Sequence, residues 1–168
     1  MQLEIRNELD RYLQGILQDS VFEMDISIDY LNRNINASYE ALGSYDLEEL
    51  EELEPSFTEK LFFHIDASGQ DDVTIYKKAG IDRRLFSKIR SNKAYTPSKS
   101  TAISLGLSLE LSEEAMEDFL ESAGYALSRS TRADLIVRFF INHHVYDLLE
   151  INDYLAYHNE GLLGGALK

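Results

Sequence analysis

Hydrophobic residues recur at helical spacing along most of this chain. In residues 2–17 a stripe of leucines that includes Leu3 and Leu9 is interspersed with charged positions, which predicts an amphipathic helix. Residues 25–42 favour a second helix, although the first few positions alternate briefly as in a strand. The run 46–54 is acidic, with leucines at three-residue spacing, and it is interpreted as a solvated helix face or a linker.

From Pro55 onward, start and stop signals divide the pattern into five short helices. Ser56 and Glu59 have the spacing of a capping box, in which each side chain bonds a free backbone N–H of the first turn. Gly80 permits the left-handed backbone of a tight turn between the second and third helices. The expected N-caps are Ser56, Asp71, Asp82, Ser98 and Ser112. The five helices are expected at about 57–68, 72–79, 83–92, 99–109 and 113–123.

The pattern beyond residue 128 predicts one or two further helices between Thr131 and His158. A turn at Asn142-His143-His144 would separate them. The glycine-containing tail 161–168 is expected either to fray or to dock through its two leucines. The predicted fold is therefore all-α. Its expected parts are an N-terminal helical extension (1–54), a five-helix bundle (55–128) and a C-terminal helical segment that packs on the bundle (129–168).

The charge is distributed unevenly along the chain. The net charge is −14, which by itself argues against nucleic acid, because phosphate contacts require cations. The window 77–99 nevertheless contains eight lysines and arginines, half of the 16 in the chain, and a single acid, Asp82. This window carries +7 and the remainder carries −21. A solvated patch would explain an arbitrary basic run, but this one coincides with a motif, and together they indicate an anion-binding face.

The motif is TIYKKAGIDRRLFSKIRSNK, residues 74–93. It resembles the helix-turn-helix of Xre-type regulators, with Gly80 in the turn, Asp82 as the cap of the recognition helix, and Phe86 and Ile89 at its buried positions. A lambda-repressor-like fold is implied, with residues 83–92 facing a major groove. Tyr76 departs from this pattern, because alanine usually stands there. The residues expected to contact DNA are Lys77, Lys78, Arg83, Arg84, Ser87, Lys88, Arg90, Ser91, Lys93 and Lys99.

A longer resemblance runs from Pro55 to about Gly165. It is carried by Ser56-Phe57 and by the segments YKKAGIDRRLFSKIRSNKAYTPSKSTAISL, ESAGYALS and INDYLAYHNEGLLG. This part is similar to a bacterial module of unsettled role that is often fused to macro domains. The resemblance implies a helix-turn-helix-like accessory or targeting module in phage-defence or mobile-element contexts. Residues 1–54 are too short for a macro domain, so no ADP-ribose chemistry is carried over.

No residue pattern indicates catalysis or a cofactor. The chain lacks cysteine, and its four histidines lack the HExxH spacing of a zinc enzyme. There is no GxxxxGK[ST] phosphate loop and no GxSxG nucleophile motif. The prediction is a non-enzyme with no cofactor and no metal. The lack of a signal-peptide pattern and of a long apolar run indicates a cytoplasmic protein that does not contact membrane.

Two functional hypotheses follow from the sequence. The first is a DNA-binding transcriptional regulator or DNA-targeting module, which binds double-stranded DNA and forms a homodimer, as proteins with lambda-type motifs usually do. The second is a non-catalytic adaptor or inhibitor that keeps the scaffold and binds a protein partner. The strongly acidic remainder of the chain and Tyr76 favour the second hypothesis, whereas the basic window favours the first.

Overall fold

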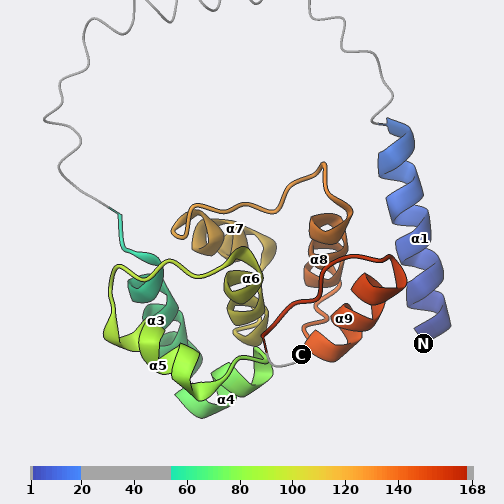
Figure 1. The fold of residues 1–168 in the computed structure, drawn as a ribbon. Helices are drawn as coiled ribbons and strands as arrows, with labels where there is room; N and C mark the ends of the chain where they lie inside the picture. Colours follow the sequence, from blue (N-terminus) through green and yellow to red (C-terminus); the bar gives the residue numbers. More distant parts are fainter. Residues whose placement is uncertain (1, 20–53, 166–168) are drawn as a thin grey trace, which may run out of the picture. The chain divides into compact units, whose positions relative to one another are not determined.

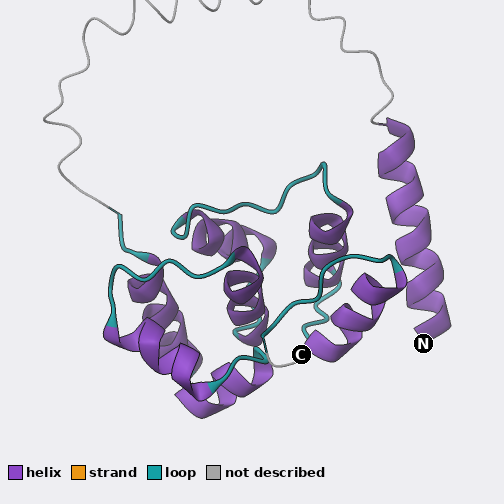
Figure 2. Ribbon diagram, viewed as in Figure 1, coloured by secondary structure: helices purple, strands orange, loops and turns teal. Residues whose placement is uncertain are grey.

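The computed structural model describes residues 2–19 and 54–165, which contain eight helices and no strand (Figures 1 and 2). The all-α prediction is therefore confirmed for this part of the chain. Of the described residues, 2–13 and 55–165 belong to one compact unit, and 14–19 and 54 fall outside it. The helix predicted over residues 25–42 and most of the acidic run 46–54 lie outside the described residues.

The helices correspond closely to those predicted. They are α1 (Gln2–Asp19), α3 (Phe57–Ser68), α4 (Asp72–Lys78), α5 (Arg83–Ser91), α6 (Lys99–Ser108), α7 (Glu113–Glu121), α8 (Arg132–Asn142) and α9 (Leu148–Tyr157). The region 131–158 forms two helices, α8 and α9, and the predicted turn at residues 142–144 lies between them.

Polar caps begin the bundle helices where the sequence predicts them. Ser56 and Glu59 form a complete capping box at the start of α3. Asp71 and Asp82 accept hydrogen bonds from backbone N–H groups at the starts of α4 and α5, and Ser98 and Ser112 do the same for α6 and α7. Each cap satisfies a donor that the helix itself leaves free, which fixes where the helix begins.

Helix α6 forms the centre of the bundle. Its residues from Ala102 to Ser108 are all buried, and it contacts α4, α7 and α9 (Figure 1). Gly106 allows α7 to approach closely, because a Cβ atom there would lie 2.5 Å from the Met116 sulfur. Phe119 of α7 and Phe140 of α8 are fully buried beside this axis. The contact with α6 therefore fixes the position of α4, and the other side of the α4–α5 pair is left open to solvent.

The segment after α9 docks against the bundle. Asn152 of α9 is 4% exposed, and its amide donates to the Leu163 carbonyl at 3.0 Å and accepts from the Leu163 N–H at 2.8 Å. The Gly165 N–H donates to the Gly80 carbonyl at 3.1 Å. Leu163 is buried while Leu162 is exposed. Of the two expectations for this tail, docking is confirmed, and it is carried by Leu163 rather than by both leucines.

Helix α1 contributes two leucines to the same unit. Leu9 and Leu13 are buried, and the Tyr12 ring lies 5.5 Å from the Phe139 ring of α8. The sequence predicted this amphipathic helix over residues 2–17, and α1 extends two residues further.

Acid is expected to weaken the starts of α3 and α4. Hydrogen bonds from the Ser56 backbone N–H and hydroxyl hold the pKa of Glu59 below its usual range, and the Thr74 N–H does the same for the pKa of Asp71. Both carboxylates then stabilise the fold at neutral pH, and this stabilisation is lost as the pH falls through their unfolded values toward their lower folded values. Thermal unfolding of the wild type and Glu59→Gln between about pH 3 and pH 7 should show the difference in midpoint shrinking toward acid. A constant difference would contradict this role of the carboxylate.

Candidate nucleic-acid interface

Helix α5 has two distinct faces. Asp82 caps its start by accepting from the Leu85 N–H at 2.9 Å. Phe86 and Ile89, which the motif places on the inner face, are 3% and 0% exposed. On the outer face Arg83, Arg84, Ser87, Lys88 and Ser91 are all exposed. The charged outer side chains are thus presented to solvent by a helix whose position is fixed by its apolar side.

The connection between α4 and α5 is a tight turn centred on Gly80. This glycine has a φ of 61°, and the Ile81 N–H reaches back to the Tyr76 carbonyl at 3.0 Å. Ile75, Ala79 and Ile81 are buried around the turn. The left-handed turn predicted at Gly80 is confirmed, and it closes the last turn of α4 in the Schellman pattern.

Tyr76 packs between the two helices of this pair. Its ring is partly buried and lies 5.7 Å from the Phe86 ring centroid, and the Phe62 ring of α3 lies 6.0 Å from Phe86 on an edge-to-face approach. The bulky residue at the usual alanine position therefore joins an aromatic cluster, which stabilises the α4–α5 pair through buried area and ring contacts.

Four of the eight cations in the basic window form ion pairs within the protein. These pairs are Lys78 with Glu110 (3.1 Å), Arg90 with Asp72, Lys93 with Glu59 (3.3 Å) and Lys99 with Asp134 (2.6 Å). The eight cations of the window are opposed by Asp82 and by the four carboxylates of these ion pairs. The local excess is therefore three positive charges. Lys77, Arg83, Arg84 and Lys88 form no ion pair with any described residue, so the available charge is concentrated on α5 and the end of α4.

Lys99 differs from the other predicted DNA contacts because its ammonium pairs with a buried carboxylate. Its partner Asp134 is 4% exposed and also accepts the Ser128 N–H at 2.8 Å. The lysine therefore neutralises a buried carboxylate that joins the start of α6 to α8 and to the loop before it. This position makes Lys99 a structural residue.

Two cations of the basic window lie over aromatic rings. The Lys88 ammonium is 5.3 Å from the Tyr95 ring centroid, and the Arg90 guanidinium is 4.8 Å from the Phe62 centroid. Arg90 is thereby held by both a ring and the Asp72 carboxylate, whereas Lys88 is held by the ring alone. Lys88 keeps all of its ammonium hydrogens for a ligand, and Arg90 does not.

The start of α4 is acidic. Asp66, Asp71 and Asp72 lie close together there and line one shallow hollow with Lys77 and Arg90. The Asp71 carboxylate also occupies the N-terminus of α4 by accepting the Thr74 N–H at 2.8 Å. A free helix N-terminus can bind a phosphate, but here a carboxylate already fills it and would repel an anion.

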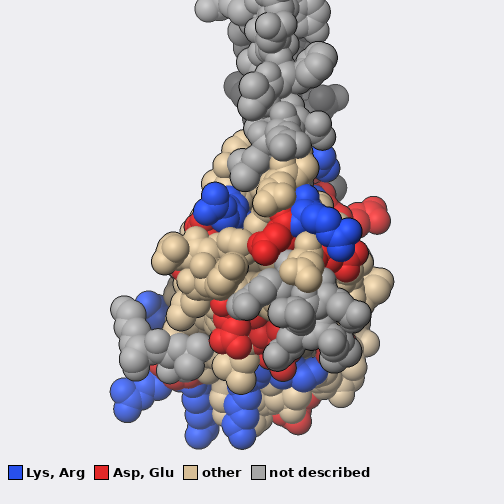
Figure 3. Space-filling model, turned by 90° about the vertical axis from the view of Figure 1, so that its right-hand side faces the viewer, with Lys and Arg blue, Asp and Glu red and all other residues tan. Residues whose placement is uncertain are grey.

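The overall surface is mixed in charge. In the view of Figure 3, lysine and arginine side chains project at the lower end of the molecule, at the height of α4 and α5, and others lie near the upper end, with acidic side chains between and beside them. The projecting cations at the lower end agree with the basic window of the sequence.

The sequence did not reveal the residues that pack against the turn between α4 and α5. The Leu148 side chain lies against Gly80, and Gly164 is so close that a Cβ atom would lie 3.3 Å from the Ala79 and Gly80 carbonyl oxygens. Asn152 holds this segment in place. The only sequence signal was a polar residue on the apolar side of α9, and a buried asparagine among apolar residues usually has a specific partner.

Comparison with known protein families, curated proteins and solved structures finds no match to this chain. Within the described residues no group of acidic residues and histidines could hold a metal ion. None of the described helices is both long and apolar enough to cross a bilayer.

Proposed function

We propose that this chain is a DNA-binding protein in which α4 and α5 form a helix-turn-helix of the lambda-repressor kind and α5 is the recognition helix. The observation that carries the proposal is the pair of faces on α5. Phe86 and Ile89 anchor the helix, while Arg83, Arg84 and Lys88 extend outward without an ion-pair partner among the described residues. A helix with its side chains is about 10 to 12 Å across, which suits the width of a major groove of about 12 Å.

The individual side chains are assigned by their charge and freedom. Arg83 and Arg84, at the start of α5, are the proposed base-reading residues, because a guanidinium can donate two hydrogen bonds to guanine. Lys77 at the end of α4 is proposed to contact phosphate. Lys88 is proposed to reach either a base or a phosphate, and Ser87 lies between these cations on the same face. Lys78, Arg90 and Lys93 are secondary contacts, since each must first leave a carboxylate.

Charge reversal at the start of α5 tests the proposal directly. Fluorescence anisotropy with a mixed pool of labelled duplexes should show binding at low salt that Arg83→Glu/Arg84→Glu weakens by about a hundredfold or more. The matched control is Arg129→Glu/Arg132→Glu, which changes the net charge equally at two exposed arginines distant in sequence from α5. Equal losses in both variants would overturn the assignment of α5, because only net charge would then matter.

Salt dependence gives a second expected value. The two unpaired lysines proposed to reach phosphate, Lys77 and Lys88, predict that the logarithm of the binding constant falls by at most about two units per tenfold increase in salt for each bound chain, since each phosphate contact contributes about 0.9. A steeper slope would mean that Lys78, Arg90 or Lys93 also leaves its carboxylate to contact phosphate. Arg90→Gln would then reduce the slope by about one unit.

A second candidate function is a protein-binding adaptor or inhibitor that keeps the helix-turn-helix scaffold. The observation that favours it is the acidic start of α4, where Asp71 caps the helix N-terminus that could otherwise attract a phosphate, and where Asp72 neutralises Arg90. This candidate predicts no DNA binding even at low salt. The anisotropy experiment therefore distinguishes the two functions before any partner is known.

A further inference from the structure

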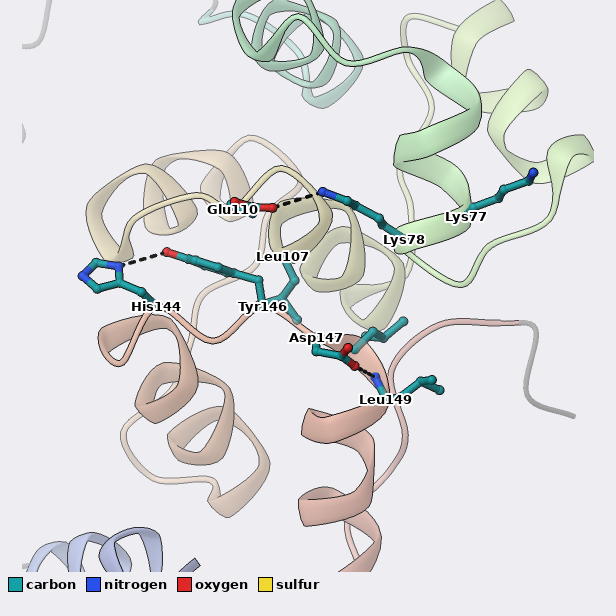
Figure 4. Close-up of a pocket in the computed structure, with 9 residues that line it drawn as sticks. Lys77, Lys78, Leu107, Glu110, His144, Tyr146, Asp147 and Leu149 are labelled. Atoms are coloured by element: carbon teal, nitrogen blue, oxygen red, sulfur yellow. Dashed lines mark hydrogen bonds and ion pairs between the residues drawn. The ribbon is translucent and has the colours of Figure 1, made fainter. Parts of the chain in front are cut away.

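A pocket opens beside the α4–α5 pair, at the end of α4 that leads into the turn. It lies between that end of α4, the turn after α6 and the loop joining α8 to α9 (Figure 4). Its volume of about 530 Å³ is within the range of small-molecule sites. The proposed DNA contacts do not account for this pocket, because most of its walls come from the α6 and α8–α9 turns.

Two of its residues have an unusual backbone conformation. Glu110 follows α6 and His144 follows α8, and both have a φ of 55°. In each case the helix closes in the Schellman pattern, and glycine is the residue usually found at this left-handed position. The chain does place glycine at the equivalent ends of α3, α4 and α7. Side chains retained at a conformational cost, and converging on one pocket, indicate a role for those side chains.

The polar groups of the pocket are mainly hydrogen-bond donors. Lys78 reaches across to Glu110 at 3.1 Å and keeps further ammonium hydrogens free. His144 Nδ1 lies 3.4 Å from the Tyr146 hydroxyl (Figure 4), so a neutral pair leaves one outward donor, either the His144 Nε2–H or the Tyr146 O–H. Burial, with a further contribution from Glu110, raises the pKa of Tyr146, so its hydroxyl remains a donor at neutral pH. The Asp147 carboxylate already accepts the Leu149 and Glu150 N–H groups.

The other wall is apolar. Leu107 and Leu148 are buried at its base, and Leu149 is 65% exposed at its edge. Leu149 is one of only a few large apolar side chains that the described surface leaves exposed. An apolar wall that faces a cluster of donors suits a ligand with an apolar body and an anionic end.

We propose that this pocket binds a small organic carboxylate, with its anionic end near Lys78, His144 and Tyr146 and its apolar body against Leu107, Leu148 and Leu149. The proposal does not require that the protein bind DNA. Lys78 belongs to α4, so an occupied pocket would contact the same helix that carries Lys77. Lys77 also lines the pocket, so a ligand there would lie beside two proposed DNA contacts of α4 and away from the base-reading residues of α5.

Hexanoate is the probe that tests this site. Titration of the full chain, followed by amide chemical shifts in NMR, should give a millimolar Kd with shifts at Glu110, His144 and Tyr146. Acetate has the same anionic end without the chain, and hexan-1-ol has the chain without the charge. Both are expected to bind at least about tenfold more weakly, since each loses one wall of the pocket. No saturable shifts with hexanoate would overturn the proposal, and equal binding of acetate would overturn its apolar half.

Variants separate ligand binding from folding. His144→Gly should keep or raise the thermal midpoint, by about 2 °C, because glycine relieves the left-handed backbone, yet it should weaken hexanoate at least about fivefold. Tyr146→Phe and Lys78→Met should weaken hexanoate in the same way. The matched control is Asn159→Gly, at the third left-handed position (φ 58°), which lies outside the pocket lining. Unchanged hexanoate affinity in His144→Gly and Lys78→Met would overturn the site.

Discussion

Replacing Asn152 with alanine is expected to lower the free energy of unfolding by about 2 to 4 kcal/mol, because two buried backbone groups would lose their partner at once. The Leu163 N–H and carbonyl both bond to the Asn152 amide, and that residue is 4% exposed. Alanine offers neither a donor nor an acceptor. The tail would then have to leave its site to hydrate these groups, and Leu163 would lose its buried position.

Urea unfolding measures this loss, and hydrogen exchange locates it. In Asn152→Ala the Leu163 and Gly165 amides should exchange much faster than in the wild type, since both are protected only while the tail is docked. Asn142→Ala is a suitable control, because Asn142 is exposed at the end of α8, and it should change stability by less than about 0.5 kcal/mol. Equal exchange at Leu163 in wild type and variant would contradict the role of Asn152.

Lys99→Met is expected to lower the free energy of unfolding by about 2 to 3 kcal/mol, because it leaves the buried Asp134 carboxylate without its countercharge. The comparison variant is Lys78→Met, which makes the same substitution in an exposed pair with Glu110 and should cost about 0.5 kcal/mol or less. Chemical denaturation of both variants gives the two values. Equal losses of unfolding free energy in the two variants would show that burial of Asp134 does not control the strength of its ion pair.

The Lys99→Met variant also tests whether Lys99 belongs to the proposed DNA interface. A lysine whose ammonium lies 2.6 Å from Asp134 is not free to contact phosphate. We therefore expect the salt dependence of DNA binding in Lys99→Met to equal that of the wild type, when it is measured below the unfolding transition. A slope reduced by about one unit would instead return Lys99 to the interface.

The helices could be predicted from the sequence because their signals are local. Capping residues such as Ser56, Asp71 and Asp82 act within one turn of their own helix, and apolar periodicity assigns the inner face of α5. The start of α9 is also set by a local cap. Asp147 accepts the Leu149 and Glu150 N–H groups, so α9 begins after it, and Tyr146 lies in the preceding loop.

The candidate site could be predicted only in part, because its charge depends on contacts distant in sequence. The basic window was evident, yet the acids that neutralise Lys78, Lys93 and Lys99 come from three other parts of the chain. Their approach follows from packing and leaves no pattern along the sequence. The outer face of α5 could be predicted, since Arg83, Arg84 and Lys88 have no such partners among the described residues.

The docked tail also affects the order in which this protein folds. The hydrogen bond from Gly165 to Gly80 joins positions far apart in the sequence, whereas each helix and its caps form from neighbouring residues. Contacts across long loops form late, because the chain must first lose the entropy of closing them. During synthesis α4 and α5 would emerge well before the segment that braces their turn. The α4–α5 pair is therefore expected to assemble early in a loosely held form and to reach its final rigidity only when the tail docks.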